Sequence, residues 1–173
     1  MKHSPAPVLK RIVSGGQTGA DRAALDFARA HHIPHGGWCP HGRLAEDGTI
    51  DPHYHLKETP TPSYAQRTEW NVRDSDGTVI FSIAQEIFGG SKLTAELARR
   101  YKKPCLHLSH KVDGEKAAKK LRQFLEENKI HILNVAGPRA SSEPEVAHFT
   151  KSVLEAWWKF ANGKGASDKP LEY

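Results

Sequence analysis

Three glycine-containing segments carry the residue types that bind anions. Glycines let backbone N–H groups approach a ligand closely, and a helix that follows adds unpaired N–H groups and a positive dipole end. The segments lie near the N-terminus, near the middle of the chain and around Gly137. Their candidate anion-binding residues are Gly15, Gly16, Gln17, Thr18, Gly19 and Arg22 in the first, Gly89, Gly90, Ser91, Lys92, Thr94 and Glu96 in the second, and Arg139 in the third.

The spacing of these glycines matches no common nucleotide-binding motif. It is neither the G-x-G-x-x-G of dinucleotide-binding folds nor the G-x-x-x-x-G-K of P-loops. The segments therefore predict an anion site without naming its ligand. The alternative is a set of tight strand-to-helix turns that bind nothing, with Asp21 as a helix cap and with Arg22 and Glu96 facing solvent.

A further set of polar residues shares one stripe of a predicted helix. Arg67, Asn71 and Asp74 are spaced i, i+4 and i+7, which places their side chains on one face, and Ser75 follows at the helix end. If this stripe lines a cleft, the rigid donor fork of arginine suits anionic oxygens, and the asparagine amide can both donate to and accept from a polar edge of a ligand. If this stripe faces solvent instead, it is an ordinary charged surface.

The histidines and cysteines form no metal-binding motif in the sequence. None of the 11 histidines occurs in H-E-x-x-H or in a Cys/His zinc spacing, and 2 cysteines are too few for an iron–sulfur cluster. The composition around Cys105 predicts a buried strand residue, and the glycine-rich setting of Cys39 predicts an exposed one. We therefore assign no metal ligand and no catalytic residue from the sequence.

Strands and helices alternate along the chain, which predicts an α/β fold with a mostly parallel sheet and helices on both faces. Such sheets bind ligands at the carboxyl ends of their strands, so the three glycine segments should meet at one edge. The predicted strands are 8–14, 78–82, 105–108 and 130–136, with a short strand or turn at 33–39. The predicted helices are 18–31, 63–74, 92–102, 115–129 and 142–160, and 40–62 is predicted to be a long loop.

Several polar residues are predicted to cap these helices. Ser63 is the predicted N-cap of the helix at 63–74, and Asp113 of the helix at 115–129. Ser141 or Ser142 is predicted to cap the last helix, with Glu145 as the carboxylate of a capping box.

The composition indicates one soluble domain. The chain has 173 residues, and its 25 basic and 20 acidic side chains leave a mild net charge of +5, which suits an anionic small ligand. It has no long basic run for nucleic acid, no stretch near the ~20 apolar residues of a membrane helix and no apolar core of a signal peptide. We therefore expect a cytoplasmic protein that binds neither nucleic acid nor membrane, with one domain at 1–161 and a polar tail at 162–173.

Four long stretches are similar to the molybdenum carrier family, part of the SLOG superfamily and related to the LOG-like (lysine-decarboxylase-like) proteins. They are residues 12–24, 34–48, 66–78 and 133–139, and the resemblance spans about residues 11–158. It implies a Rossmann-like three-layer α/β/α fold, circularly permuted within the superfamily. It also implies a homo-oligomer, dimer or tetramer, that binds the molybdenum cofactor, a pterin with a phosphate tail and a dithiolene-bound oxo-molybdenum. With this cofactor, Arg67 is expected to bind phosphate or molybdate oxygens and Asn71 the pterin edge.

Three functions remain open at this point. The first is a carrier that stores and protects the cofactor and hands it to molybdenum enzymes, with phosphate, sulfate or molybdate also able to occupy the site. The second is a nucleotide-processing N-glycosidase in which Glu96 or Asp74 activates water. The related phosphoribohydrolases have a Gly-Gly-x-Gly-Thr-x-x-Glu turn, where Lys92 and Leu93 here replace the third glycine and the threonine, and this departure disfavours hydrolysis. The third is a nucleotide-binding module.

Overall fold

The computed structural model describes residues 9–163, and its centre is a five-stranded sheet. The strands lie in the order β2-β1-β9-β7-β8, and every neighbouring pair is parallel, which confirms the predicted sheet. Their bounds are Arg11–Val13 for β1, His35–Gly36 for β2, Gly77–Ser82 for β7, Cys105–Ser109 for β8 and Ile132–Ala136 for β9. Most of the polar tail predicted at 162–173 lies outside the described residues.

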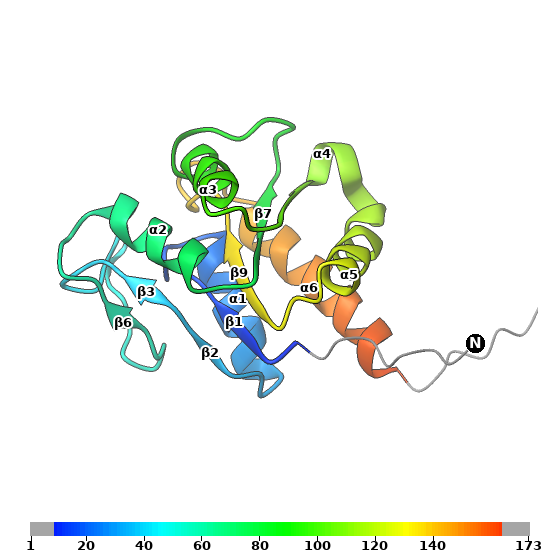
Figure 1. Ribbon diagram of the computed structural model, residues 1–173, viewed down its shortest axis with the longest axis horizontal. Coiled ribbons are helices and arrows are strands. Elements are labelled where there is room, and N and C mark those ends of the chain that lie inside the picture. Colours follow the sequence, from blue (N-terminus) through cyan, green and yellow to red (C-terminus); the bar gives the residue numbers. More distant parts are fainter. Residues whose placement is uncertain (1–8, 164–173) are drawn as a thin grey trace, which may run out of the picture.

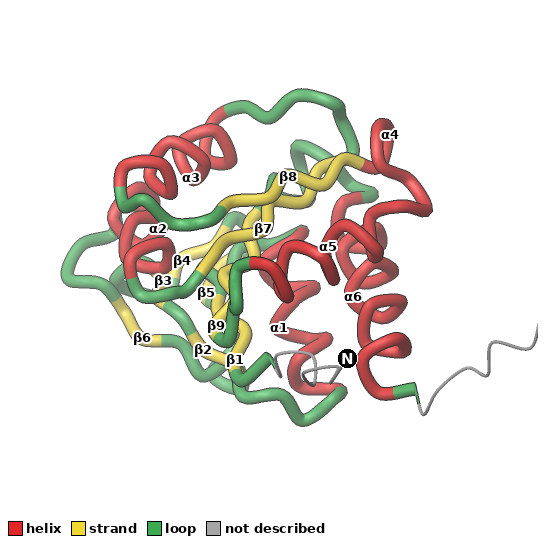
Figure 2. The backbone as a smooth tube through the Cα atoms, turned by 45° about the vertical axis from the view of Figure 1, so that its right-hand side comes forward, coloured by secondary structure: helices red, strands yellow, loops and turns green. Residues whose placement is uncertain are grey.

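Helices cover both faces of this sheet, giving a three-layer α/β/α arrangement (Figure 1). Helices α2 and α3 pack together on one face, and α1, α5 and α6 lie on the other (Figure 2). The bounds are Ala20–Ala30 for α1, Tyr64–Arg73 for α2, Gly89–Arg100 for α3, His110–Asp113 for α4, Ala117–Glu127 for α5 and Val146–Asn162 for α6, with a 3₁₀ turn at Gly114–Lys116. No helix within 9–163 is long and apolar enough to cross a bilayer.

The two faces of the sheet are packed unequally. Ile12 and Leu133 of the sheet and Phe27 of α1 belong to a large buried cluster on the face that carries α1, α5 and α6. Full burial of each such side chain contributes about 1.5–3 kcal/mol. On the other face, Val72 of α2 and Leu97 of α3 belong to a much smaller cluster. The polar side chains of α2 are therefore free to border a cleft.

The segment at 40–62 is more ordered than predicted. The segment contains an antiparallel hairpin of β4 and β5, and its third strand, β6, pairs in parallel with β3, which lies just before the segment. These strands are β4 at Leu44–Ala45, β5 at Gly48–Thr49, β6 at Lys57–Glu58 and its partner β3 at Trp38–Cys39. Ile50 and Tyr54 of the segment are buried against Leu25 of α1. The prediction of a loop was wrong because strands of two residues show no hydrophobic periodicity.

One of the three predicted caps is present. Ser63 accepts a hydrogen bond from the N–H of Gln66 at 3.3 Å and caps α2, as predicted. The prediction for Asp113 was wrong, because its carboxylate accepts the N–H of Ser109 at 2.7 Å and does not cap α5. The predicted capping of the last helix was also wrong, because α6 begins at Val146 without a side-chain cap. The side chains concerned are Ser141, Ser142 and Glu145.

The two cysteines have exposures opposite to those predicted. Cys39 is buried, because β3 pairs with β6 and the Ile50 cluster packs over it. Cys105 is exposed, because it begins β8, the edge strand of the sheet. Within residues 9–163, no group of three or more His, Cys, Asp or Glu side chains is arranged to hold a metal ion.

Candidate functional site

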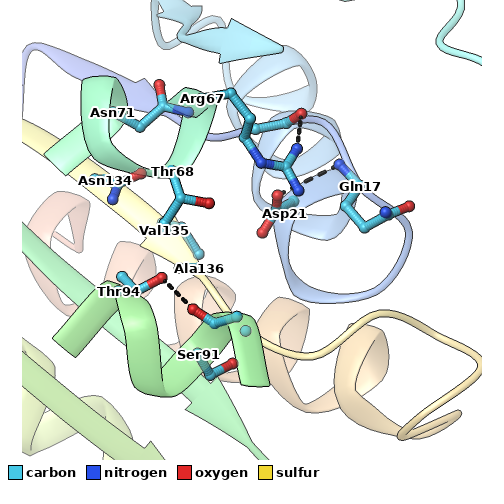
Figure 3. Close-up of a pocket in the computed structure, with 13 residues that line it drawn as sticks. Gln17, Asp21, Arg67, Thr68, Asn71, Ser91, Thr94, Asn134, Val135 and Ala136 are labelled. Atoms are coloured by element: carbon cyan, nitrogen blue, oxygen red, sulfur yellow. Dashed lines mark hydrogen bonds between the residues drawn. The ribbon is translucent and has the colours of Figure 1, made fainter. Parts of the chain in front are cut away.

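The three glycine segments meet at the carboxyl ends of β1, β7 and β9, where they border one cleft (Figure 3). Gly15 follows β1, Gly90 lies in the first turn of α3 after β7, and Gly137 follows β9, which confirms the predicted common edge. The cleft is small: its cavity volume is about 70 Å³, well below the ~300–1,000 Å³ of drug-sized ligand sites. Its other lining residues are Gln17, Asp21, Arg67, Thr68, Asn71, Ser91, Thr94, Asn134, Val135 and Ala136.

Arg67 is the cationic group of the cleft. It projects from α2 and is only 8% exposed. Its Nη1 donates to the carbonyl oxygen of Gly15 at 2.7 Å, and its guanidinium carbon lies 5.1 Å from the ring centre of Tyr64. Among the described residues it makes no ion pair and no other side-chain hydrogen bond, so its remaining N–H donors are available to a ligand.

The start of α3 supplies further donors from the opposite wall. No residue of the described chain accepts a hydrogen bond from the N–H of Gly89 or Gly90, and no side chain caps this helix. Ser91 is 5% exposed, and its hydroxyl has no partner within residues 9–163. The hydroxyl of Thr94 donates to the carbonyl of Gly90 at 2.8 Å. Free N–H groups at a helix N-terminus favour an anion.

The glycines of the cleft are present for different reasons. A Cβ at Gly15 would lie 2.5 Å from Nη1 of Arg67, and one at Gly137 would lie 2.5 Å from the carbonyl oxygen of Phe81. A Cβ at Gly90 would meet nothing within 4 Å. Internal packing therefore requires glycine at Gly137, where the neighbour is backbone. At Gly15 a side chain would displace Arg67, and at Gly90 the missing side chain keeps the cleft open.

Asp21 places a carboxyl group in the cleft, although the sequence suggested for it only a capping role. It is 7% exposed, and its Oδ2 accepts the N–H of Gln17 at 3.3 Å. Burial raises the pKa of Asp21 to about 6, and the positive charge of Arg67 opposes this rise. An aspartate two residues into a helix is so often a local cap that the sequence pattern alone did not distinguish this role.

Asn71 borders the cleft, but both the oxygen and the nitrogen of its side-chain amide are hydrogen-bonded to the backbone of Trp38. Its Oδ1 accepts the N–H of Trp38 at 2.8 Å, and its Nδ2 donates to the carbonyl of Trp38 at 2.8 Å. The side chain is 3% exposed. Asn71 therefore ties α2 to β3, and its hydrogen-bonding capacity toward a pterin edge is largely used.

Replacing Asn71 with alanine should lower the free energy of unfolding by about 1–3 kcal/mol, because it leaves a buried N–H and a carbonyl of Trp38 unpaired. Urea denaturation followed by circular dichroism measures this change. The neighbouring Thr68→Ala, which removes one hydroxyl at the cleft, is the matched control. Unchanged stability together with lost ligand binding would contradict the structural role and assign Asn71 to direct contact.

Asp74 and Ser75 lie outside the cleft. The carboxylate of Asp74 accepts the indole N–H of Trp38 at 2.8 Å and forms an ion pair with Arg73 at 2.8 Å. These donors lower the pKa of Asp74, Arg73 most strongly. The hydroxyl of Ser75 donates to the carbonyl of Val72 at 3.2 Å. Both side chains hold the end of α2 in place.

The basic and hydroxyl groups of the first and third segments turn toward the hairpin of β4 and β5. Arg22 forms an ion pair with Asp47 and donates to the carbonyl of Gly16 at 3.0 Å. Thr18 donates to Glu46, and Arg139 lies 3.7 Å from the same carboxylate. The hairpin carboxylates therefore already neutralise the two arginines predicted as counter-charges.

The predicted residues divide into those at the cleft and those away from it. Those that line the cleft are Gly15, Gln17, Arg67, Asn71, Gly90, Ser91 and Thr94. Those that do not are Gly16, Thr18, Gly19, Arg22, Asp74, Ser75, Gly89, Lys92, Glu96 and Arg139. The sequence missed Asp21 and Thr68. It placed the third glycine segment at this edge but named only Arg139 from it as a binding residue, whereas Asn134–Gly137 line the cleft.

The order of the strands connects this site to a known family. The central strand β9 comes last in the chain; if β9 and α6 preceded β1, the sheet order would read 3-2-1-4-5, as in dinucleotide-binding Rossmann folds. Residues 12–158 match the model described as "Circularly permutated YpsA SLOG family". The chain belongs to this family. In this permuted SLOG fold, the turn at Gly137 takes the place of the first strand-to-helix turn of a Rossmann fold.

A solved structure agrees with this assignment. The crystal structure of a protein from Syntrophus aciditrophicus, named "Putative molybdenum carrier protein", is 51% identical, with 88% of this chain and 96% of that chain covered and a TM-score of 0.85. No curated protein matches the chain. The predicted family resemblance and the Rossmann-like fold are therefore confirmed for this SLOG protein.

Proposed function

We propose that this SLOG protein carries the molybdenum cofactor and holds the cofactor's terminal phosphate in the cleft. The observation that carries this proposal is Arg67, a guanidinium more than nine-tenths buried that makes one hydrogen bond and, among the described residues, no ion pair. A buried charge without a partner is costly, and a bound anion would compensate it. The name of the 51% identical Syntrophus protein supports the choice of cofactor.

The donors around the cleft fit the oxygens of a phosphate group. Arg67 offers charge from α2, and at the start of α3 the N–H of Gly90 and the Ser91 hydroxyl have no partner within the described chain. Each charge-assisted hydrogen bond contributes on the order of 1.5–3 kcal/mol. We propose that the protein binds the cofactor mainly through its phosphate end. The amide of Asn71, which was predicted to bind the pterin edge, is instead hydrogen-bonded to the backbone of Trp38.

The rest of the proposal follows from the function of a carrier. A carrier passes its cargo on, so we propose molybdenum enzymes as its recipients and the cytoplasm as its location. We also retain the homo-oligomer that the family resemblance implies. Inorganic phosphate would compete with the cofactor for the same donors.

Hydrolysis of an N-glycosidic bond is a second candidate function, and Asp21 is the observation that favours it. Neither carboxylate predicted for this reaction lines the cleft: Glu96 is exposed on α3, and Asp74 is held by Arg73. Asp21 does line it, and a carboxyl group with a pKa of about 6 can exchange a proton near neutral pH.

Three measurements on the purified protein separate these functions. Mass spectrometry with elemental analysis identifies what co-purifies, and titration with molybdenum cofactor measures binding directly. The same protein is incubated with nucleoside monophosphates and assayed for free base. Cofactor binding that Arg67→Ala weakens, without release of base, supports the carrier. Base released at ordinary enzyme rates, and lost in Asp21→Asn, supports the hydrolase and contradicts a pure carrier.

A further inference from the structure

A carboxyl group and a guanidinium share the cleft without pairing. Asp21 and Arg67 both line it and both are less than 10% exposed, yet they form no ion pair with each other. Asp21 instead accepts the N–H of Gln17, with the backbone of Gly15 as a further donor to its carboxylate, and Arg67 donates to the carbonyl of Gly15. A ligand in the cleft therefore meets an anionic hydrogen-bond acceptor beside a cationic donor (Figure 3).

The presence of a carboxylate beside a guanidinium restricts which oxyanions fit the cleft. An ionised carboxylate only accepts hydrogen bonds, so an oxyanion without a proton would set acceptor against acceptor and like charge against like charge. Inorganic phosphate retains a proton near neutral pH and can donate it to Asp21 while its other oxygens accept from Arg67. Sulfate is also a tetrahedral oxyanion but has no proton to donate near neutral pH.

We propose that Asp21 is a specificity-determining residue, through which the cleft accepts a phosphate group that brings or shares a proton and rejects sulfate and molybdate. This inference rests on the proposed function, because it concerns the same phosphate subsite. It narrows the ligand class to phosphate and phosphomonoesters. A phosphomonoester loses its second proton at a pKa of ~6, so above that pH its binding takes up one proton.

The surroundings of Asp21 determine how this selectivity changes with pH. The cationic groups that act on it are Arg67 of α2 and Arg22 of its own helix. The groups that line the cleft from α3 and β9 are uncharged: Gly90, Ser91, Thr94, Asn134, Val135 and Ala136. Burial raises the pKa of Asp21 to about 6. Below that pH the protonated carboxyl can donate to sulfate, so the preference for phosphate should fade.

Calorimetric titration of the full chain in phosphate-free buffer tests this inference. At about pH 8 we expect inorganic phosphate to bind at least about tenfold more tightly than sulfate, and at about pH 5 we expect the two affinities to agree within about threefold. Equal affinities at the higher pH would overturn the role of Asp21 and leave the phosphate subsite intact. If neither phosphate nor the cofactor bound, both this inference and the proposed function would be contradicted.

Asp21→Asn provides the second test, because its amide keeps an acceptor for Gln17 and adds a donor for the ligand. Sulfate affinity at about pH 8 should rise at least about tenfold in this variant and match that of phosphate. Glu96→Gln removes an exposed carboxylate on α3 and should change neither affinity. If Asp21→Asn does not fold, the pH series on the unsubstituted protein decides alone. A variant that folds and still discriminates against sulfate would overturn the inference.

Discussion

Replacing Arg67 with alanine should weaken the binding of inorganic phosphate by about ten- to a hundredfold, because it removes one or two charge-assisted hydrogen bonds of about 1.5–3 kcal/mol. The loss should be as large for the molybdenum cofactor if its phosphate occupies the same donors. Calorimetric titration measures both. The melting temperature should change by only a few degrees, because water from the open cleft can hydrate the freed carbonyl of Gly15.

Two further variants make this result specific. Arg67→Lys keeps the charge but loses the planar fork, and its affinity should fall between those of the alanine variant and the unsubstituted protein. Arg100→Ala removes an exposed arginine from the end of α3 and is the matched control for net charge. Phosphate affinity that is unchanged in a folded Arg67→Ala protein would exclude this residue from the site.

Adding a side chain at Gly90 should abolish detectable phosphate binding without cost to the fold. Leucine at this position would project into open space at the cleft and block approach to the α3 N-terminus. Since glycine is about 0.8–1.0 kcal/mol less favourable than alanine in a helix, and leucine is close to alanine, the variant should be at least as stable as the parent. Calorimetric titration and urea denaturation on the same sample measure the two effects.

Gly137→Ala is the contrasting variant. Its Cβ would lie 2.5 Å from the carbonyl oxygen of Phe81 and 2.6 Å from Cβ of Ala20, both in the packed interior. We expect it to destabilise the fold by about 1–3 kcal/mol. A Gly90→Leu variant that binds phosphate normally, or one as unstable as Gly137→Ala, would contradict the assignment of Gly90 to the ligand.

The sequence was sufficient to predict the layers and the edge of the sheet where the cleft lies. The alternation of strands and helices determines a parallel sheet, and parallel strands bring all their carboxyl ends to one side. Helical periodicity likewise predicted that Arg67 and Asn71 border the same cleft, because residues spaced i and i+4 share a face of the helix. These features depend on local pattern and on general rules of topology.

The side of the turn to which each residue points was not predictable. In the first glycine segment, Gly15 and Gln17 line the cleft, whereas a Cβ added at Gly16, between them, would lie 2.6 Å from Cδ1 of Leu56. A side chain at Gly16 would therefore disturb packing under the hairpin before it reached a ligand. Such alternation depends on backbone angles within an irregular turn, which no periodic pattern encodes.

The two predicted counter-charges lie beside carboxylates and not at the cleft, for a different reason. Arg22 and Arg139 are basic residues beside glycines, as expected for an anion site, but the carboxylates of Asp47 and Glu46 reach them from the hairpin of β4 and β5. That hairpin was predicted to be a loop. A contact between distant segments could be found only once the fold had brought them together.

The position of β9 has a consequence for how the chain reaches its folded state. The ribosome makes this central strand late, after both of its neighbours, and Arg11 of β1 pairs with Ile132 far along the chain. Until β9 inserts, β1 and β7 each expose an open edge, and such edges attract other chains. Closure of so long a loop slows folding. We therefore expect the sheet to be completed, and the cleft to become able to load cargo, only after synthesis has passed Gly137.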